Sequence, residues 1–137
     1  MRSYRVDEIE GIGPVMAGRL RNAGVKTLNQ LLEQGSSPRG RRELSEASGI
    51  ADAVILKWVN MADLFRVRGI GGEYAELLEK AGVDTVKELR TRNPQNLHAK
   101  LVETNSAGRG LVRQLPGLGR VSHWTEQARR LAPKVTY

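Results

Sequence analysis

The sequence contains no cysteine, only six aromatic residues in 137, and no apolar run longer than a few residues. Without cysteine, the chain has no disulfide framework, no thiolate zinc site and no thiol nucleophile. The short apolar runs exclude a membrane-spanning helix, and no apolar core of signal-peptide length follows the first residues. We therefore expect a cytoplasmic protein of one domain or two very small ones, without a membrane partner.

Recognisable catalytic patterns are also missing. The sequence has no phosphate-binding loop of the nucleotide hydrolases, no nucleophile elbow, no zinc-protease motif and no cluster of acids. His98 and His123 have neither a second histidine nor a paired carboxylate at ligand spacing. The sequence therefore predicts a protein that is not an enzyme and that holds no metal and no cofactor.

Positive charge is in excess and is unevenly distributed. Twenty-two lysines and arginines against fifteen acids give a net charge of +7. Residues 1–63 carry nine basic and eight acidic side chains, whereas residues 64–137 carry thirteen and seven. Such a surplus attracts polyanions at long range. If a polyanion binds, we expect it to prefer the C-terminal half.

The chain contains an internal repeat. A shift of 58 residues superimposes residues 9–31 on residues 67–89, with ten of 23 positions identical. The identical positions are glycines, apolar residues and one threonine: Gly11/Gly69, Ile12/Ile70, Gly13/Gly71, Ala17/Ala75, Leu20/Leu78, Ala23/Ala81, Gly24/Gly82, Val25/Val83, Thr27/Thr85 and Leu31/Leu89. This pattern is typical of two copies of one structural unit.

Each copy carries the local signals of short helices. Apolar residues recur at helical spacing, Gly24 and Gly82 are placed to end a helix, and no window alternates at period two. Capping patterns at Thr27 and Thr85, and Ser-Pro and Asn-Pro pairs, begin further helices. The expected segments are helices over 13–22, 38–47, 51–63, 94–103 and 119–131, and a surface loop over 105–110. We predict an all-α fold of two tandem units, 6–63 and 64–133, with four to five short helices each.

Two Gly-Ile-Gly turns stand at equivalent places in the repeat. Gly11-Ile12-Gly13 and Gly69-Ile70-Gly71 each join two predicted helices. Glycines permit backbone angles that a side chain forbids, and the isoleucine between them is placed to fill the core. The second glycine opens a helix whose first N–H groups lack an intrahelical partner and attract anions.

These turns, with the downstream Ala-Gly-Val and threonine, resemble the helix-hairpin-helix motif in its paired form. That motif occurs in DNA ligases, repair nucleases, DNA polymerases and recombinase N-terminal domains. The resemblance covers nearly the whole chain as two tandem domains, and the chain is also similar to a group of bacterial proteins built from this doubled unit alone. It implies that hairpin N–H groups and nearby basic residues grip the phosphates of duplex DNA without reading bases.

The candidate binding residues are the hairpin glycines and the arginines beside them. They are Gly11, Gly13, Gly69, Gly71, Gly117, Gly119, Arg66, Arg68, Arg113 and Arg120. Gly117-Leu118-Gly119 is followed by Arg120, whereas Val15 and Glu73 come after the first two hairpins and Glu10 precedes Gly11. Tight helix packing is the alternative role of the glycines, and the 117–119 turn is open to interpretation as an ordinary turn. Trp58 and Trp124 are predicted to be core or inter-unit anchors rather than base-stacking groups.

The leading hypothesis is a non-catalytic, sequence-independent module that binds double-stranded DNA mainly through its C-terminal half. We expect an affinity of roughly micromolar or weaker at physiological salt, because few phosphates are neutralised per unit. The alternative is a protein–protein adaptor on the same scaffold that does not bind nucleic acid and recruits an acidic partner or itself.

Overall fold

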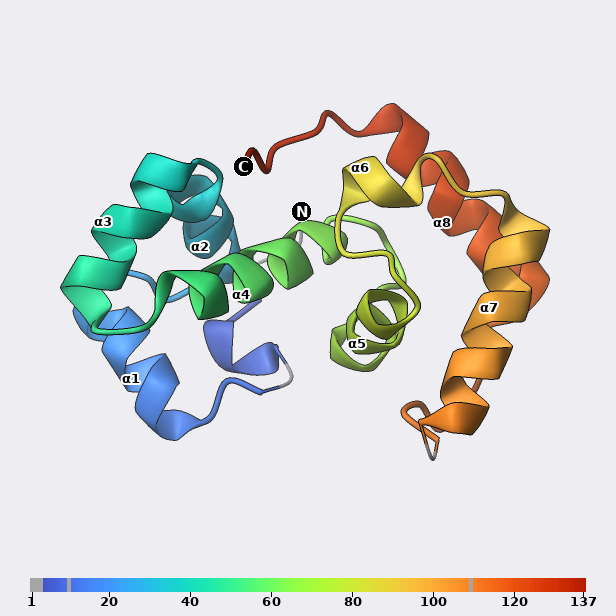
Figure 1. The fold of residues 1–137 in the computed structure, drawn as a ribbon, viewed down its shortest axis with the longest axis horizontal. Coiled ribbons are helices and arrows are strands. Elements are labelled where there is room, and N and C mark those ends of the chain that lie inside the picture. The colour runs from blue at the N-terminus through green and yellow to red at the C-terminus, as the bar shows by residue number, and fades with distance from the viewer. Residues whose placement is uncertain (1–3, 10, 109) are drawn as a thin grey trace. The chain divides into compact units, whose positions relative to one another are not determined.

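The computed structural model describes residues 4–9, 11–108 and 110–137, and these residues form eight α-helices, one 3₁₀ helix and no β-strand (Figure 1). The elements are η1 (Val6–Glu8), α1 (Pro14–Asn22), α2 (Leu28–Gly35), α3 (Pro38–Ser48), α4 (Asp52–Leu64), α5 (Gly72–Lys80), α6 (Val86–Leu89), α7 (Pro94–Ala107) and α8 (Leu118–Arg130). The all-α class predicted from the sequence is confirmed.

The chain divides into two compact units. Unit 1 comprises residues 1–63 together with the last four residues, 134–137, and unit 2 comprises residues 64–133. The domain prediction left the last four residues unassigned, because nothing in their sequence indicates what they contact. Each unit has its own buried apolar core, including Ile12, Leu20 and Trp58 in unit 1 and Ile70, Leu78 and Trp124 in unit 2.

Neighbouring helices pack against one another within each unit. In unit 1, α2 contacts α3, and α1 contacts both η1 and α3. In unit 2, α7 lies along α8, α5 contacts α7, and α6 contacts α8 (Figure 1). The predicted surface loop over 105–110 begins later than expected, because α7 continues to Ala107.

Side chains cap the first turns of several helices, as the sequence predicts. The Thr27 hydroxyl accepts a hydrogen bond from the Gln30 amide, and the Gln30 side chain accepts one from the Thr27 amide. Ser37 and Asn93 likewise cap α3 and α7. These bonds satisfy amides that would otherwise lack an intrahelical partner, which fixes where each helix begins.

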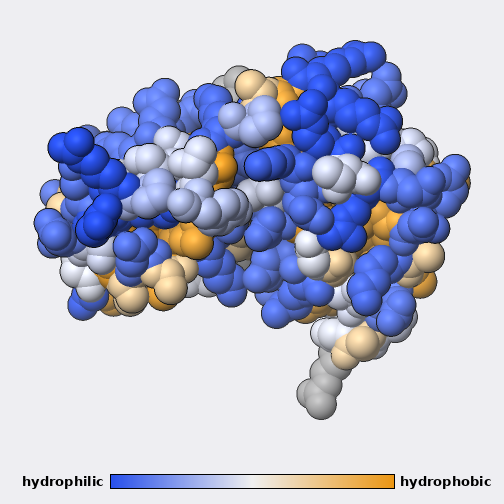
Figure 2. Space-filling view, turned by 45° about the horizontal axis from the view of Figure 1, so that its top comes forward, coloured by the Kyte–Doolittle hydropathy of each residue, from blue (hydrophilic) through white to orange (hydrophobic). Residues whose placement is uncertain are grey.

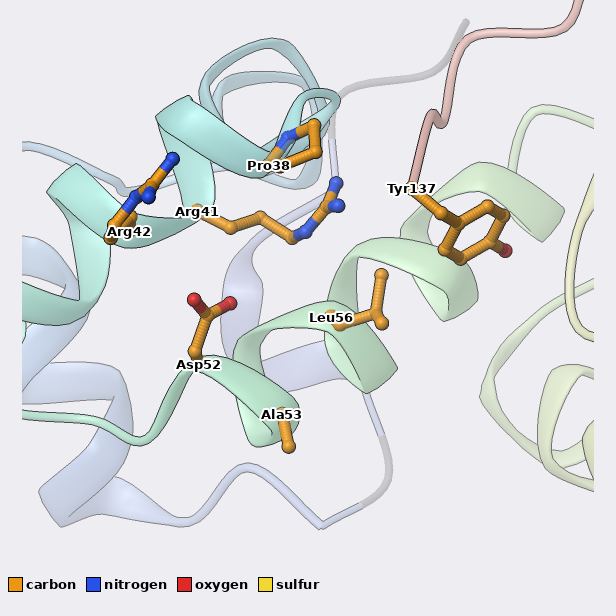
Figure 3. Close-up of a pocket in the computed structure, with 7 residues that line it drawn as sticks. All are labelled: Pro38, Arg41, Arg42, Asp52, Ala53, Leu56 and Tyr137. Carbon is orange, nitrogen blue, oxygen red and sulfur yellow. The ribbon is translucent and has the colours of Figure 1, made fainter.

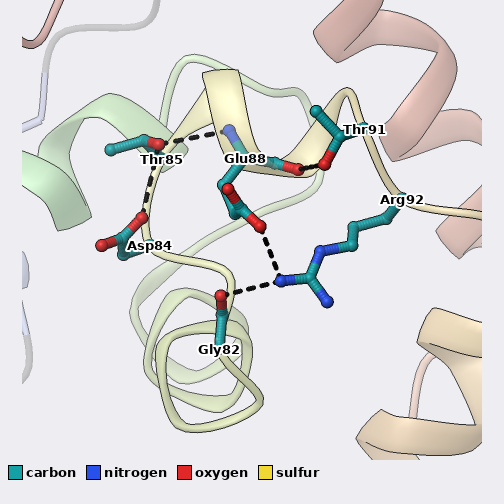
Figure 4. Close-up of polar contacts among 6 residues, drawn as sticks. All are labelled: Gly82, Asp84, Thr85, Glu88, Thr91 and Arg92. Atoms are coloured by element: carbon teal, nitrogen blue, oxygen red, sulfur yellow. Dashed lines mark hydrogen bonds and ion pairs between the residues drawn. The ribbon is translucent and has the colours of Figure 1, made fainter.

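The predicted capping box at Thr85 is only half formed. Thr85 accepts from the Glu88 amide at 3.3 Å, but the Glu88 carboxylate pairs with Arg92 at 2.7 Å instead of returning to the cap (Figure 4). The Arg92 guanidinium also donates to the Gly82 carbonyl at 3.1 Å. Arg92 therefore fastens the turn between α5 and α6, because an ionised donor offers Glu88 a stronger partner than a backbone amide.

The C-terminal tail, residues 134–137, is held against unit 1. The Thr136 amide donates to the Ser36 carbonyl at 2.8 Å, and Val135 is buried. Arg41, itself 4% exposed, donates to the carbonyls of Gly35 and Thr136 at 2.8 and 2.7 Å. A cavity of about 350 Å³ lies beside this contact, lined by Pro38, Arg41, Arg42, Asp52, Ala53, Leu56 and Tyr137 (Figure 3).

Hydrophilic side chains dominate the face of the molecule that Figure 2 draws. Figure 2 shows that they cover most of the face in view, with hydrophobic residues in small, separated areas. In the described part of the chain, the large apolar residues that stay exposed are Val15, Val54, Val102, Leu115, Leu118 and Tyr137. Among the described residues, no helix has the length and apolar character needed to cross a membrane, and no group of three or more His, Cys, Asp or Glu is placed to hold a metal ion.

Candidate nucleic-acid interface

Three turns share the same order of features, and we call them elbow A (residues 11–13), elbow B (49–51) and elbow C (69–71). Each starts with a glycine in the left-handed region, with φ of 94° at Gly11, 72° at Gly49 and 93° at Gly69. A buried isoleucine follows: Ile12, Ile50 and Ile70. The isoleucine amide donates to a carbonyl three residues earlier at elbows A and C, and to the Ser48 hydroxyl at elbow B. The prediction that Ile12 and Ile70 fill the core is confirmed. The left-handed angle requires glycine, because a side chain there costs about 1–2 kcal/mol.

The third residue of each elbow starts the next helix. The carbonyls of Gly13, Ala51 and Gly71 accept hydrogen bonds from the amides four residues later at 3.0, 3.1 and 2.8 Å. At elbow B, Ala51 stands where elbows A and C have a second glycine, and the next helix still begins there. The first glycine and the isoleucine suffice for the turn, because the third residue adopts ordinary backbone angles at elbows A and C.

Three of the helices have a glycine at the capping position, where no side chain can serve as a cap. Gly13, Gly71 and Gly117 occupy the capping positions of α1, α5 and α8, and none supplies a side-chain hydrogen bond. In contrast, side chains cap α2, α3, α6 and α7. The first-turn amides of the glycine-capped helices therefore have no capping side chain, and such amides are the groups that bind anions.

The start of α8 differs from the three elbows. Gly117 has a φ of −71° and caps the helix, whereas Gly119 lies inside its first turn. The Gly117-Leu118-Gly119 segment is therefore not a third copy of the Gly-Ile-Gly geometry. No acid lies in the first turn of α8, and Arg120 stands there instead.

Tyr74 brings the starts of α5 and α8 together. The Arg120 guanidinium donates to the Tyr74 hydroxyl at 3.1 Å and lies 5.7 Å from the centre of its ring. The Tyr74 hydroxyl donates to the Gln114 carbonyl at 2.8 Å, and its ring lies 5.2 Å from that of Trp124. A cation above an aromatic face and a hydrogen-bonded phenol restrict where Arg120 can lie.

The rear of elbow C packs against α8. A Cβ added at Gly69 would lie 3.1 Å from Trp124 Nε1, and that nitrogen is a buried donor without a hydrogen-bond partner among the described residues. The Gln127 side chain accepts from the Arg68 amide at 2.9 Å and donates to the Arg68 carbonyl at 3.2 Å. Elbow C is thus fixed to α8 by one indole and one amide side chain.

The four candidate arginines have different environments. Arg66 donates to the Ala132 carbonyl at 2.7 Å, which ties its guanidinium to the end of unit 2. The Arg68 side chain is exposed, as is Arg113, which forms no hydrogen bond or ion pair with the described residues. Arg120 is exposed but anchored to Tyr74. Of these four, Arg113 and Arg120 bracket the start of α8.

Charges differ among the helix starts. Glu73 lies in the first turn of α5 and Asp52 in that of α4. The first turn of α1 has no acid, but it also has no base, and Val15 is 68% exposed there. Glu10, which precedes elbow A, lies outside the described residues. A carboxylate at a helix start satisfies the same amides that an anion would contact and repels the anion.

Two groups that organise this region were missed in the sequence. In the sequence, Tyr74 is only one of several apolar residues at helical spacing. No pattern of neighbouring residues indicates that Gln127 contacts elbow C. Trp58 and Trp124 are buried within their units, as expected of core residues. Neither the cavity beside Arg41 nor the one of about 420 Å³ around Arg92 and Lys100 is lined by a candidate binding residue.

Comparison with known proteins gives a family. The chain matches no curated protein and no solved structure. A family model described as a domain of unknown function, DUF4332, matches residues 10–131 and so spans elbows A, B and C and the starts of α1, α4, α5 and α8. Because the match extends over most of the sequence, the chain belongs to the DUF4332 family.

Proposed function

We propose that both units are paired helix-hairpin-helix domains and that unit 2 binds the phosphates of double-stranded DNA without reading its sequence. One observation carries this proposal: two glycine-capped helix starts, those of α5 and α8, are joined through the Tyr74–Arg120 contact. Amides without capping side chains and a positioned guanidinium then share one surface. A phosphate accepts hydrogen bonds from both kinds of donor.

The charge of unit 2 supports the same partner. Residues 64–133 hold twelve basic and seven acidic side chains, and no acid occurs between Glu103 and Glu126. The start of α8 lies inside this acid-free stretch. Long-range attraction therefore concentrates a polyanion where the amides of α8 are exposed.

The expected binding mode is weak and strongly dependent on salt. Phosphate contacts release counterions, so the affinity falls as salt rises, and only a few phosphates are neutralised by one unit. We expect a dissociation constant of about a micromolar or weaker at physiological salt. Because the donors are backbone amides and arginines on the phosphate chain, duplexes of different sequence bind equally.

Fluorescence anisotropy with a labelled duplex across a salt series tests the proposal. Replacing Arg113 and Arg120 by glutamate should weaken binding at least about tenfold and lower the salt slope by about two. The matched control reverses Arg19 and Arg21, two exposed arginines of α1, and should change the affinity by less than about threefold.

Equal losses in the two double variants would contradict a site in unit 2, and binding that ignores salt would contradict phosphate contacts. Far-UV circular dichroism establishes that both variants keep their helices.

Unit 1 offers a second candidate function, an adaptor that binds another protein. The observation that favours it is the start of α1, where Val15 is 68% exposed and no charged residue lies in the first turn. An exposed apolar group without charge suits a protein surface better than a phosphate. Partners captured from a lysate that survive nuclease treatment, and are lost when Val15 is changed to serine, would support the adaptor.

A further inference from the structure

Two exposed leucines lie on the segment that joins the candidate phosphate-binding arginines. Leu115 is 38% and Leu118 is 41% exposed, and Arg113 and Arg120 flank them in the chain. The other exposed large apolar residues in the described part of the chain are isolated from one another in sequence. A single exposed leucine is ordinary on a protein surface. Here two exposed leucines lie on either side of Gly117, the capping residue of α8, and between two arginines, so the segment is amphipathic.

This segment, residues 113–120, is held in place. The Gln114 carbonyl accepts a hydrogen bond from the Tyr74 hydroxyl, and the Arg120 guanidinium donates one to the same hydroxyl. Pro116, which lies between the two leucines, is buried. Gly117 then starts α8 directly before Leu118. The two leucines are therefore presented on a pre-organised turn, and little conformational entropy is lost when they contact a partner.

The positive charge of the segment around the two leucines indicates that their partner is a polyanion. The acid-free stretch from residue 104 to residue 125 contains both leucines and both arginines. In sequence the two leucines are flanked by cations and by no acid, and the acid that the structure places toward this region is Glu73, in the first turn of α5. An apolar group flanked by cations complements duplex DNA, in which phosphates surround stacked bases. Apolar side chains of this kind enter duplexes by separating adjacent base pairs.

We propose that Leu115 and Leu118 form a wedge that contacts the bases of DNA whose stacking is locally weakened, so that unit 2 prefers a duplex containing a mismatch over a fully paired one. This inference rests on the proposed DNA-binding function and names its preferred substrate. Separating intact base steps costs a few kcal/mol, and that cost is smallest where a base is mismatched. The phosphate contacts of Arg113 and Arg120 are the same on both duplexes, so the wedge alone supplies the preference.

The test compares two labelled duplexes that differ only by one central mismatch. Anisotropy should show the wild-type protein binding the mismatched duplex about tenfold more tightly, which corresponds to about 1.4 kcal/mol. Leu115→Ser with Leu118→Ser should reduce this ratio to about one while leaving the salt slope unchanged. Val102→Ser is the matched control, since Val102 is 37% exposed on α7, and it should keep the tenfold ratio.

Each alternative outcome is decisive. A wild-type ratio near one, or a ratio that survives the double leucine change, overturns the wedge while salt-dependent duplex binding leaves the proposed function standing. Absence of binding to either duplex overturns both. Anionic phosphatidylglycerol vesicles form a second arm. If the leucine change abolishes vesicle binding and leaves the mismatch ratio intact, the leucines contact a lipid surface and the wedge is wrong.

Discussion

Elbows A and C have nearly the same backbone but different surroundings. Gly11 and Gly69 adopt φ of 94° and 93°, and each is followed by a buried isoleucine. A Cβ at Gly11 would meet nothing within 4 Å, whereas one at Gly69 would meet the Trp124 indole at 3.1 Å. The shared turn is therefore a local property of the sequence. What packs behind it decides whether it is a plain connection or part of a larger surface.

The largest expected effect separates strain from packing at these two glycines. Gly11→Ala should destabilise unit 1 by about 1–2 kcal/mol, because alanine is strained at a positive φ. Gly69→Ala should destabilise unit 2 by about 3 kcal/mol, because the added methyl group also crowds Trp124. Urea unfolding followed by tryptophan fluorescence measures both losses. Gly11→Ala is made in a Trp124→Phe background, so that the remaining Trp58 reports on unit 1. Gly69→Ala is made in a Trp58→Phe background, so that the remaining Trp124 reports on unit 2. Equal losses of unfolding free energy in the two variants would show that the Trp124 indole moves aside for the added methyl group. Elbow C would then be packed no more tightly than elbow A.

A second comparison concerns the arginine that fastens each unit. Arg41 is 4% exposed and holds two carbonyls, whereas the Arg92 side chain is 34% exposed and holds Gly82 and Glu88. Arg41→Met should destabilise unit 1 by about 2–3 kcal/mol, because the buried Gly35 carbonyl and the partly buried Thr136 carbonyl lose a charged donor. Arg92→Met should destabilise unit 2 by about 1 kcal/mol or less, since solvent replaces its partners. Thermal unfolding checks both, and a milder effect at Arg41 would mean that the tail is not held as described.

The smallest expected effect concerns the acid at the start of α5. Glu73→Gln should strengthen duplex binding about two- to threefold, because it removes a negative charge beside the first amides of the helix. Glu79→Gln is the control, since it makes the same charge change near the other end of α5 and should have less effect. Anisotropy at low salt is the measurement. If both variants gain equally, only net charge matters and the α5 start does not contact phosphate.

The sequence predicts the features that depend on neighbouring residues. The repeat, the left-handed glycines, the Thr27, Ser37 and Asn93 caps and the buried isoleucines all follow from patterns a few residues long. Glu88 shows where this reasoning fails. Its position predicts a cap, but Arg92 competes for the carboxylate and forms the stronger pair.

The arrangement of the candidate site depends on contacts between distant residues, and these are not visible in the sequence. Tyr74 meets Arg120 across 46 positions, and Gln127 meets Arg68 across 59. The tail contact between Arg41 and Thr136 spans 95 positions. Tertiary packing determines each of these partners, so the sequence identifies the arginines of unit 2 without indicating which of them is positioned.

Titration of the ¹⁵N-labelled protein with a duplex, followed by amide chemical shifts, tests the central claim most directly. We predict the largest shifts at Gly117, Leu118, Gly119 and Arg120, smaller shifts at Gly71 and Gly72, and little change at elbow A. These shifts should disappear at high salt, because phosphate contacts weaken as counterions accumulate. Shifts confined to the first turn of α1, or none in unit 2, would contradict the claim that the start of α8 binds DNA phosphates.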